Sequence, residues 1–123
     1  MPDLDITLKE AMQIEGAIGA AVVDSTSGMA LGTAGGGKEL DLTIAAAGNS
    51  DVVRATIRAQ ELLGEHGTIE DILVTLGEQY HLIRPLTGRS GRDLFMYLAL
   101  NKRRANLAMA RHQLRQVEQT LNL

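Results

Sequence analysis

The sequence predicts an α/β chain of the α+β type: a five-stranded antiparallel sheet with one long helix on one face and two helices on the other. Three observations predict it. Apolar residues recur at helical spacing in three segments, five short apolar runs lie between them, and the turns within each group of strands are short. Short turns permit only antiparallel pairing, because a parallel crossover needs a dozen residues or more. The expected order is therefore helix, two strands, helix, three strands, helix.

The first half of the chain is expected to contain a helix, a hairpin and a longer helix. The expected ranges are about 4–15 for the first helix, 17–24 and 29–34 for the strands, and about 40–63 for the long helix. Leu4, Leu8 and Ala11 recur at helical spacing, and Gly16 suits the end of that helix. The strands are apolar runs around a Ser-Thr-Ser-Gly turn, and three consecutive glycines separate this hairpin from the long helix.

The second half is expected to contain three strands and a last helix. The expected ranges are 72–76, 79–86 and 93–100 for the strands, and a helix that Asn101 caps and that runs to about Leu121. An earlier start of the first of these strands, at Ile69, is the alternative, and the segment 87–92 is expected to be a loop. The last helix carries an apolar stripe at spacings of three and four, formed by Leu107, Ala110, Leu114, Val117 and Leu121.

The composition indicates one globular domain over residues 1–123 and excludes several classes of protein. Hydrophobic residues make up 45% of the chain and charged residues 22%, which argues against intrinsic disorder. Because cysteine is absent, disulfides and thiolate metal sites are excluded. The net charge of −3 argues against a dedicated nucleic-acid-binding protein. The chain has no apolar run of about 18 residues and begins with acidic residues, so we expect a cytoplasmic protein without integral membrane association.

The central helix is the most informative segment, because it has two apolar faces. One face is formed by Ile44, Gly48, Val52, Ala55, Ala59 and Leu62, and the second by Leu42, Ala46, Val53 and Ile57. One face can cover the sheet of its own chain, and the second needs another partner, most simply the same helix of a second chain. With Asn49 beside it, we assign the second face to a homodimer contact. The alternative is a monomer in which a larger sheet or the loops cover both faces.

The charged residues of this helix form a single arc. After the first turn, which contains Asp41, the arc is formed by Asp51, Arg54, Arg58 and Glu61, which fall within about 80° of one another. In a dimer of these helices the arc would lie at the outer edge of the pair. We therefore assign the arc to contact with a different partner.

A near match to the phosphate-binding loop precedes the central helix. The segment 32–39 reads GTAGGGKE, but Glu39 stands where the motif requires a hydroxyl group for Mg²⁺. A carboxylate at that position repels phosphate oxygens, so we interpret the segment as a connector. A nucleotide hydrolase that uses Gly37 and Lys38 is the alternative.

The remaining candidates for chemistry are isolated. His66, His81 and His112 have no partner at metal-ligand spacing, which favours surface or packing roles. The sequence therefore predicts no enzyme, no cofactor and no metal site. Basic residues cluster on the last helix, where we place Arg104, Arg111 and Arg115 on one stripe. Because aromatic residues are not interleaved with them, a solvated face or a patch for an acidic protein is favoured over nucleic acid or an acidic membrane.

Several segments resemble the roadblock/dynein light-chain domain family. GAIGAAVVDSTSGMALG is similar to its first hairpin, where an apolar strand ends in Val-Val-Asp before a turn that contains glycine. YHLIRPL, LFMYLAL and RRANLAMARHQLRQ are similar to its closing hairpin and last helix. The resemblance covers about 4–121 and is closer to the bacterial single-domain members than to the eukaryotic light chains.

The resemblance implies a homodimer, or a pair with a related chain, in which the central helices pack together. It also implies that the third strands join the two sheets edge to edge, which adds Ile72 and Val74 to the expected contact. Members of the family act with Ras-like small GTPases, and some bacterial members are encoded beside such a GTPase and a sensor kinase. The family has no recognised catalytic residue, so the resemblance implies no active site.

We therefore expect a non-enzymatic homodimer that binds a Ras-like small GTPase and acts on its nucleotide cycle or localisation. The alternative is a dimeric scaffold for a kinase–GTPase signalling or polarity complex that leaves GTP hydrolysis unchanged.

Overall fold

The computed structural model describes residues 2–38, 40–65, 67–86 and 93–121. Within these residues the elements are α1 (Pro2–Met12), β1 (Ala17–Asp24), β2 (Met29–Gly35), α2 (Leu42–Leu62), β3 (Ile72–Thr75), β4 (Gln79–Leu86), β5 (Leu94–Asn101) and α3 (Leu107–Glu118). The loop expected at 87–92 lies outside the described residues, as do Glu39 and His66.

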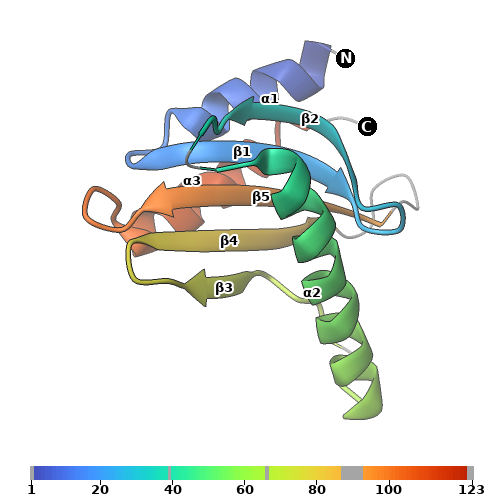
Figure 1. Ribbon diagram of the computed structural model, residues 1–123. Helices are drawn as coiled ribbons and strands as arrows, with labels where there is room; N and C mark the ends of the chain where they lie inside the picture. The colour runs from blue at the N-terminus through green and yellow to red at the C-terminus, as the bar shows by residue number, and fades with distance from the viewer. Residues whose placement is uncertain (1, 39, 66, 87–92, 122–123) are drawn as a thin grey trace.

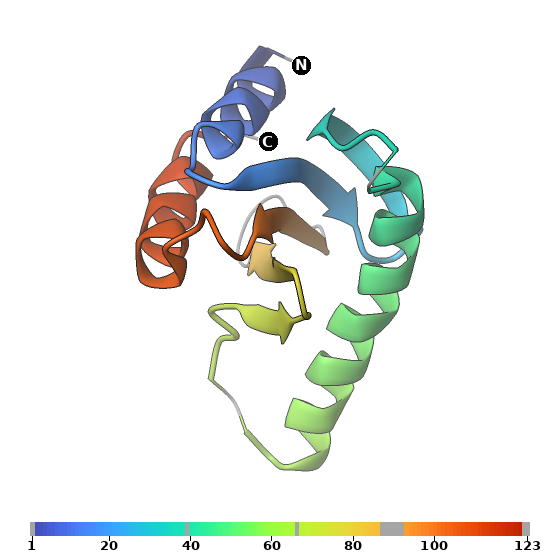
Figure 2. The same ribbon diagram turned by 60° about the vertical axis from the view of Figure 1, so that its left-hand side comes forward.

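The five strands form one antiparallel sheet in the order β2-β1-β5-β4-β3 (Figure 1). Helix α2 lies on one face, and α1 and α3 lie side by side on the other (Figure 2). The predicted fold class and element order are confirmed. Helix α2 is the crossover, since it follows the strand at one edge of the sheet and precedes the strand at the other.

The sheet separates two apolar cores. Leu8 and Ala11 of α1 and Leu114 of α3 pack on one face, and Ala46 and Val53 of α2 pack on the other. The central strand β5 is buried from its first residue to its seventh, because helices cover it on both sides. This explains why its sequence reads as a continuous apolar run rather than as an alternating one.

The strands begin and end within one residue of their expected positions, but the helices do not: α2 begins at Leu42 instead of near residue 40, and α1 and α3 differ more. Helix α1 ends at Met12 instead of near residue 15. After Met12 the amides of Gln13 and Ile14 donate to carbonyls three residues back, instead of four as in an α-helix. The prediction that Asn101 caps the last helix is wrong. Asn101 ends β5, and Asn106 caps α3 by accepting a hydrogen bond from the amide of Met109 at 3.1 Å.

The cause lies in the backbone after β5. The amide of Asn101 still donates to the carbonyl of Gly16 at 2.7 Å, so the strand continues through it, and its side chain caps the turn that follows instead of a helix. Arg104 therefore lies in that turn and not on α3, which corrects the predicted basic stripe. Of the helices described in the structure, none combines the length and the hydropathy that a bilayer crossing demands.

Candidate interaction surface

Helix α2 is longer than the sheet it covers. Its first half packs on β1 and β2, whereas its second half continues past β3, the strand at the opposite edge of the sheet from β2 (Figures 1 and 2). At the end of this overhanging half, Leu62 and Leu63 are 78% and 83% exposed. We call residues 56–63 the overhang.

The first turn of α2 is fixed by its cap. The carboxylate of Asp41 accepts hydrogen bonds from the amides of Thr43 at 3.0 Å and Ile44 at 3.1 Å. The amide of Gly36 donates to the carbonyl of Ile18 at 2.9 Å. The amide of Gly36 and the first amides of α2 are thus occupied by the chain itself, which supports the interpretation of this segment as a connector.

The face of α2 that covers the sheet is not the one expected. Leu42, Ala46 and Val53, which were assigned to a dimer contact, are buried against their own sheet, with Ala46 and Val53 only 1% and 2% exposed. That assignment is wrong for these three residues. Ser50 completes the face because its hydroxyl donates to the carbonyl of Ala46 at 2.7 Å, so a polar residue is tolerated there.

One flank of α2 has a regular spacing that the sequence analysis missed. It is formed by Ala45, Asn49, Val52, Thr56, Ala59 and Leu63, at spacings of four, three, four, three and four. We call these residues the seam. The repeat of 3.5 residues is the one by which two helices stay in contact along their length, and it was visible in the sequence.

The seam is uncharged and made mostly of small side chains. The amide of Asn49 donates to the carbonyl of Ala45 at 2.8 Å, and the hydroxyl of Thr56 donates to the carbonyl of Val52 at 2.8 Å. These donors are satisfied within the helix, so both residues can enter a contact without losing a bond to water. The first four residues of the seam are half-buried, and Ala59 and Leu63 are exposed.

The charged arc lies on the opposite flank from the seam. Arg54 forms an ion pair with Asp51, and its Nη1 donates to the carbonyl of Ser25 at 2.6 Å. Arg54 therefore ties α2 to the turn between β1 and β2, whereas Arg58 and Glu61 are exposed. Between the seam and this arc, the outward face of α2 presents the exposed side chains of Ile44, Ala55 and Leu62.

The two edges of the sheet differ. The pairing of β2 with β1 shifts register between Val22 and Val23, a bulge that disfavours pairing with a further strand. Strand β3 reads Ile-Leu-Val-Thr, with no charge, proline or register shift, and pairs only with β4. Ile72 and Val74 are half-buried beside the core under α2, and Ile57 of α2 is 40% exposed. An edge of this kind pairs readily with another strand.

A polar pair lies beside this edge. His81 of β4 is opposite Val74 in the sheet, and its Nδ1 is 3.1 Å from the hydroxyl of Tyr97, while its Nε2 is 2.7 Å from Oε1 of Gln79. Burial lowers the pKa of His81 and raises the pKa of Tyr97 to about 12. His81 thus has a packing role, and the described residues contain no group of three acidic or histidine side chains that could hold a metal ion.

Solved structures resemble this arrangement, although no protein-family model and no curated protein matches the sequence. A roadblock/LC7 domain from Streptomyces avermitilis superposes with a TM-score of 0.79 and 16% identity over 96% of this chain and 93% of that chain. MglB of Myxococcus xanthus gives 0.74 and 18%, over 97% and 81%. MglC of the same organism gives 0.61 and 24%, over 96% of both chains. At these identities the similarity establishes a shared fold.

Proposed function

We propose that this chain, which has the roadblock/LC7 fold, is a non-enzymatic homodimeric module that binds a Ras-like small GTPase and regulates its nucleotide cycle or localisation. The observation that carries the proposal is the overhang of α2, a helix end with two strongly exposed leucines that extends past an unprotected sheet edge.

A second copy of the chain satisfies both features at once. A two-fold axis beside β3 would pair the two β3 strands and continue the sheet from one chain into the other. The same axis would place the overhang of each α2 on the sheet of its partner and bring the two seams together. Contact of this isologous kind is the commonest form of assembly among soluble proteins. Burial of a leucine side chain such as Leu63 contributes up to about 2 kcal/mol.

The outward face of α2 is the surface that such a dimer would leave for a different partner. Ile44 and Leu62, near the two ends of this face, are apolar and strongly exposed, and Arg58 lies one turn from Leu62. Exposed apolar side chains with an arginine near them are typical of protein–protein contacts. That the partner is a Ras-like GTPase rests on the resemblance of the sequence to the roadblock family.

The proposal predicts which substitutions weaken binding of the GTPase. Ile44→Asp and Arg58→Glu should each lower the affinity for the GTPase about tenfold or more. Ile44→Asp would bury a new charge in the contact, and Arg58→Glu would reverse the charge at its position. Isothermal titration against the Ras-like GTPase encoded nearest this gene, loaded in turn with GDP and a GTP analogue, measures this. Arg54 is a poor choice for reversal, because it also holds the turn at Ser25.

Ile6→Asp on α1 is the matched control. It makes the same substitution at another exposed isoleucine, on the face of the sheet opposite α2. Unchanged affinity in Ile44→Asp and Arg58→Glu would remove the outward face from the proposal. A loss of equal size in Ile6→Asp would do the same.

The alternative function is a dimeric scaffold for a kinase–GTPase complex. The same surface serves both functions, and GTP hydrolysis separates them. If the protein regulates the nucleotide cycle, hydrolysis or exchange by the bound GTPase changes when the protein is added. If the protein only assembles or localises the complex, the GTPase binds and both rates stay the same.

A further inference from the structure

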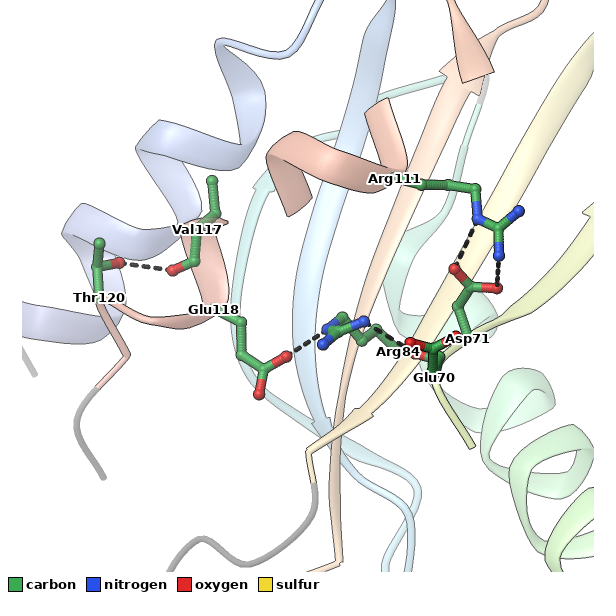
Figure 3. Close-up of polar contacts among 7 residues, drawn as sticks. All are labelled: Glu70, Asp71, Arg84, Arg111, Val117, Glu118 and Thr120. Atoms are coloured by element: carbon green, nitrogen blue, oxygen red, sulfur yellow. Dashed lines mark hydrogen bonds and ion pairs between the residues drawn. The ribbon is translucent and has the colours of Figure 1, made fainter. Parts of the chain in front are cut away.

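Two arginines hold the segment that leads into β3 (Figure 3). Nε and Nη2 of Arg111, on α3, donate to the two carboxylate oxygens of Asp71 at 2.8 and 2.9 Å. Nη1 of Arg84, on β4, donates to the carbonyl of Glu70 at 3.1 Å, and Nε of Arg84 is paired with Glu118 of α3. We call these contacts the clamp.

The clamp acts where the chain has little else to fix it. Between the end of α2 and Ile72 the described residues form no helix or strand, and most are exposed. The strand that follows has only four residues and one neighbouring strand. The side chain of Asp71 is nevertheless only 11% exposed. A bidentate arginine–carboxylate pair restricts orientation as well as distance, so it fixes the residue immediately before β3.

The register of β3 matters for its edge. Ile72 pairs with Ile83 and Thr75 with Tyr80, which places Ile72 and Val74 toward the core under α2. A slip of one residue would turn Leu73 to that side and expose the other two. The strand is uniformly apolar up to Thr75, so its own side chains select weakly against such a slip. The contact between Asp71 and Arg111 of α3 selects strongly for the observed register.

We propose that Arg111 and Arg84 are positioning residues for self-association: they fix where β3 begins, and hence the register in which β3 meets the β3 strand of a second copy. This inference rests on the proposed homodimer. It gives α3, on the opposite face of the sheet from α2, control over the edge that pairs. A two-fold dimer contains the clamp twice. A substitution in the clamp therefore displaces β3 in both chains, and both displacements weaken the dimer.

The test is Asp71→Asn in the full chain, with Glu78→Gln as the matched control. Both substitutions remove one negative charge from an ion pair beside β3, but Glu78 pairs with Arg103 at 4.0 Å and both of these side chains are largely exposed. Asp71→Asn should raise the dissociation constant of the dimer about tenfold or more, measured by sedimentation. Glu78→Gln should leave it unchanged.

Hydrogen exchange of the amides of 72–75, measured at a dilution where the protein is monomeric, supplies the second readout. Asp71→Asn should speed the exchange of those amides that face β4 about tenfold, while the amides of β1 and β5 keep their rates. The exchanged pair Asp71→Arg with Arg111→Asp should restore both the exchange rates and the dissociation constant. Faster exchange throughout the sheet, or no change at 72–75, overturns the inference.

The two proposals fail separately. If the unmodified protein stays monomeric at every concentration, the homodimer is refuted, and exchange at 72–75 still decides whether the clamp holds β3. If the protein dimerises and Asp71→Asn does so equally well, the clamp has no part in the contact and the homodimer stands.

Discussion

Single polar side chains determine how the elements near the β3 edge are held. His81 is the clearest example, because its ring nitrogens meet Tyr97 on one side and Gln79 on the other. Its ring stands edge-on to Tyr97, at 5.3 Å between centroids. Such a residue is specified by contacts between strands, so the sequence could place His81 in a strand but could not name its partners.

His81 makes the stability of the protein depend on pH. Because burial lowers its pKa from 6.5, the unfolded chain binds a proton at His81 more readily than the folded chain does. The contribution of His81 to the free energy of unfolding is therefore complete above pH 6.5 and decreases as the pH falls from 6.5 through the lowered pKa. Urea unfolding at a series of pH values between 5 and 8 measures this contribution.

His81→Gln should flatten the pH profile in this window, whereas His112→Gln, at an exposed position of α3, should leave it as it is. An identical decrease in all three proteins would show that other groups cause it.

Among the elements, α2 was correctly predicted as a long helix with excess apolar surface, but its orientation on the sheet was predicted wrongly. Its approximate length and its excess of apolar surface follow from periodicity alone. Which apolar face is turned inward does not, because hydropathy weighs Ala46 and Val53 much like Ala55 and Leu62. The sheet makes that choice: Phe95 and Tyr97 fill the space under α2, and the small residues of the inner face permit close approach.

The seam can be tested by a single substitution. Ala59 is exposed, so Ala59→Glu should leave the folded monomer intact and change its unfolding free energy by less than about 0.5 kcal/mol. In a pair of seams the same carboxylate would be buried and unpaired, which should weaken the dimer by about two orders of magnitude or more. Size-exclusion chromatography with light scattering measures the change.

Glu61→Lys provides the control, because it changes the charge two residues away, on the flank that carries the arc. If Ala59→Glu and Glu61→Lys behave alike, the seam is not the contact.

At the scale of the whole molecule, the sheet is asymmetric. One edge is bulged, the other is unprotected, and α2 reaches beyond the unprotected one. The order of the elements and the antiparallel pairing were predictable, because short turns and one long crossover leave few arrangements. The clamp was not, since Asp71 and Arg111 are 40 residues apart and only the packed fold brings them together.

The central claim is that the overhang and the β3 edge belong to a contact with a second copy of the chain. Sedimentation velocity of the unmodified protein, from nanomolar to high micromolar concentration, tests it most directly. The account predicts a reversible change from a species of 13.2 kDa to one of twice that mass, complete by micromolar concentration. A single species of 13.2 kDa over the whole range would contradict it.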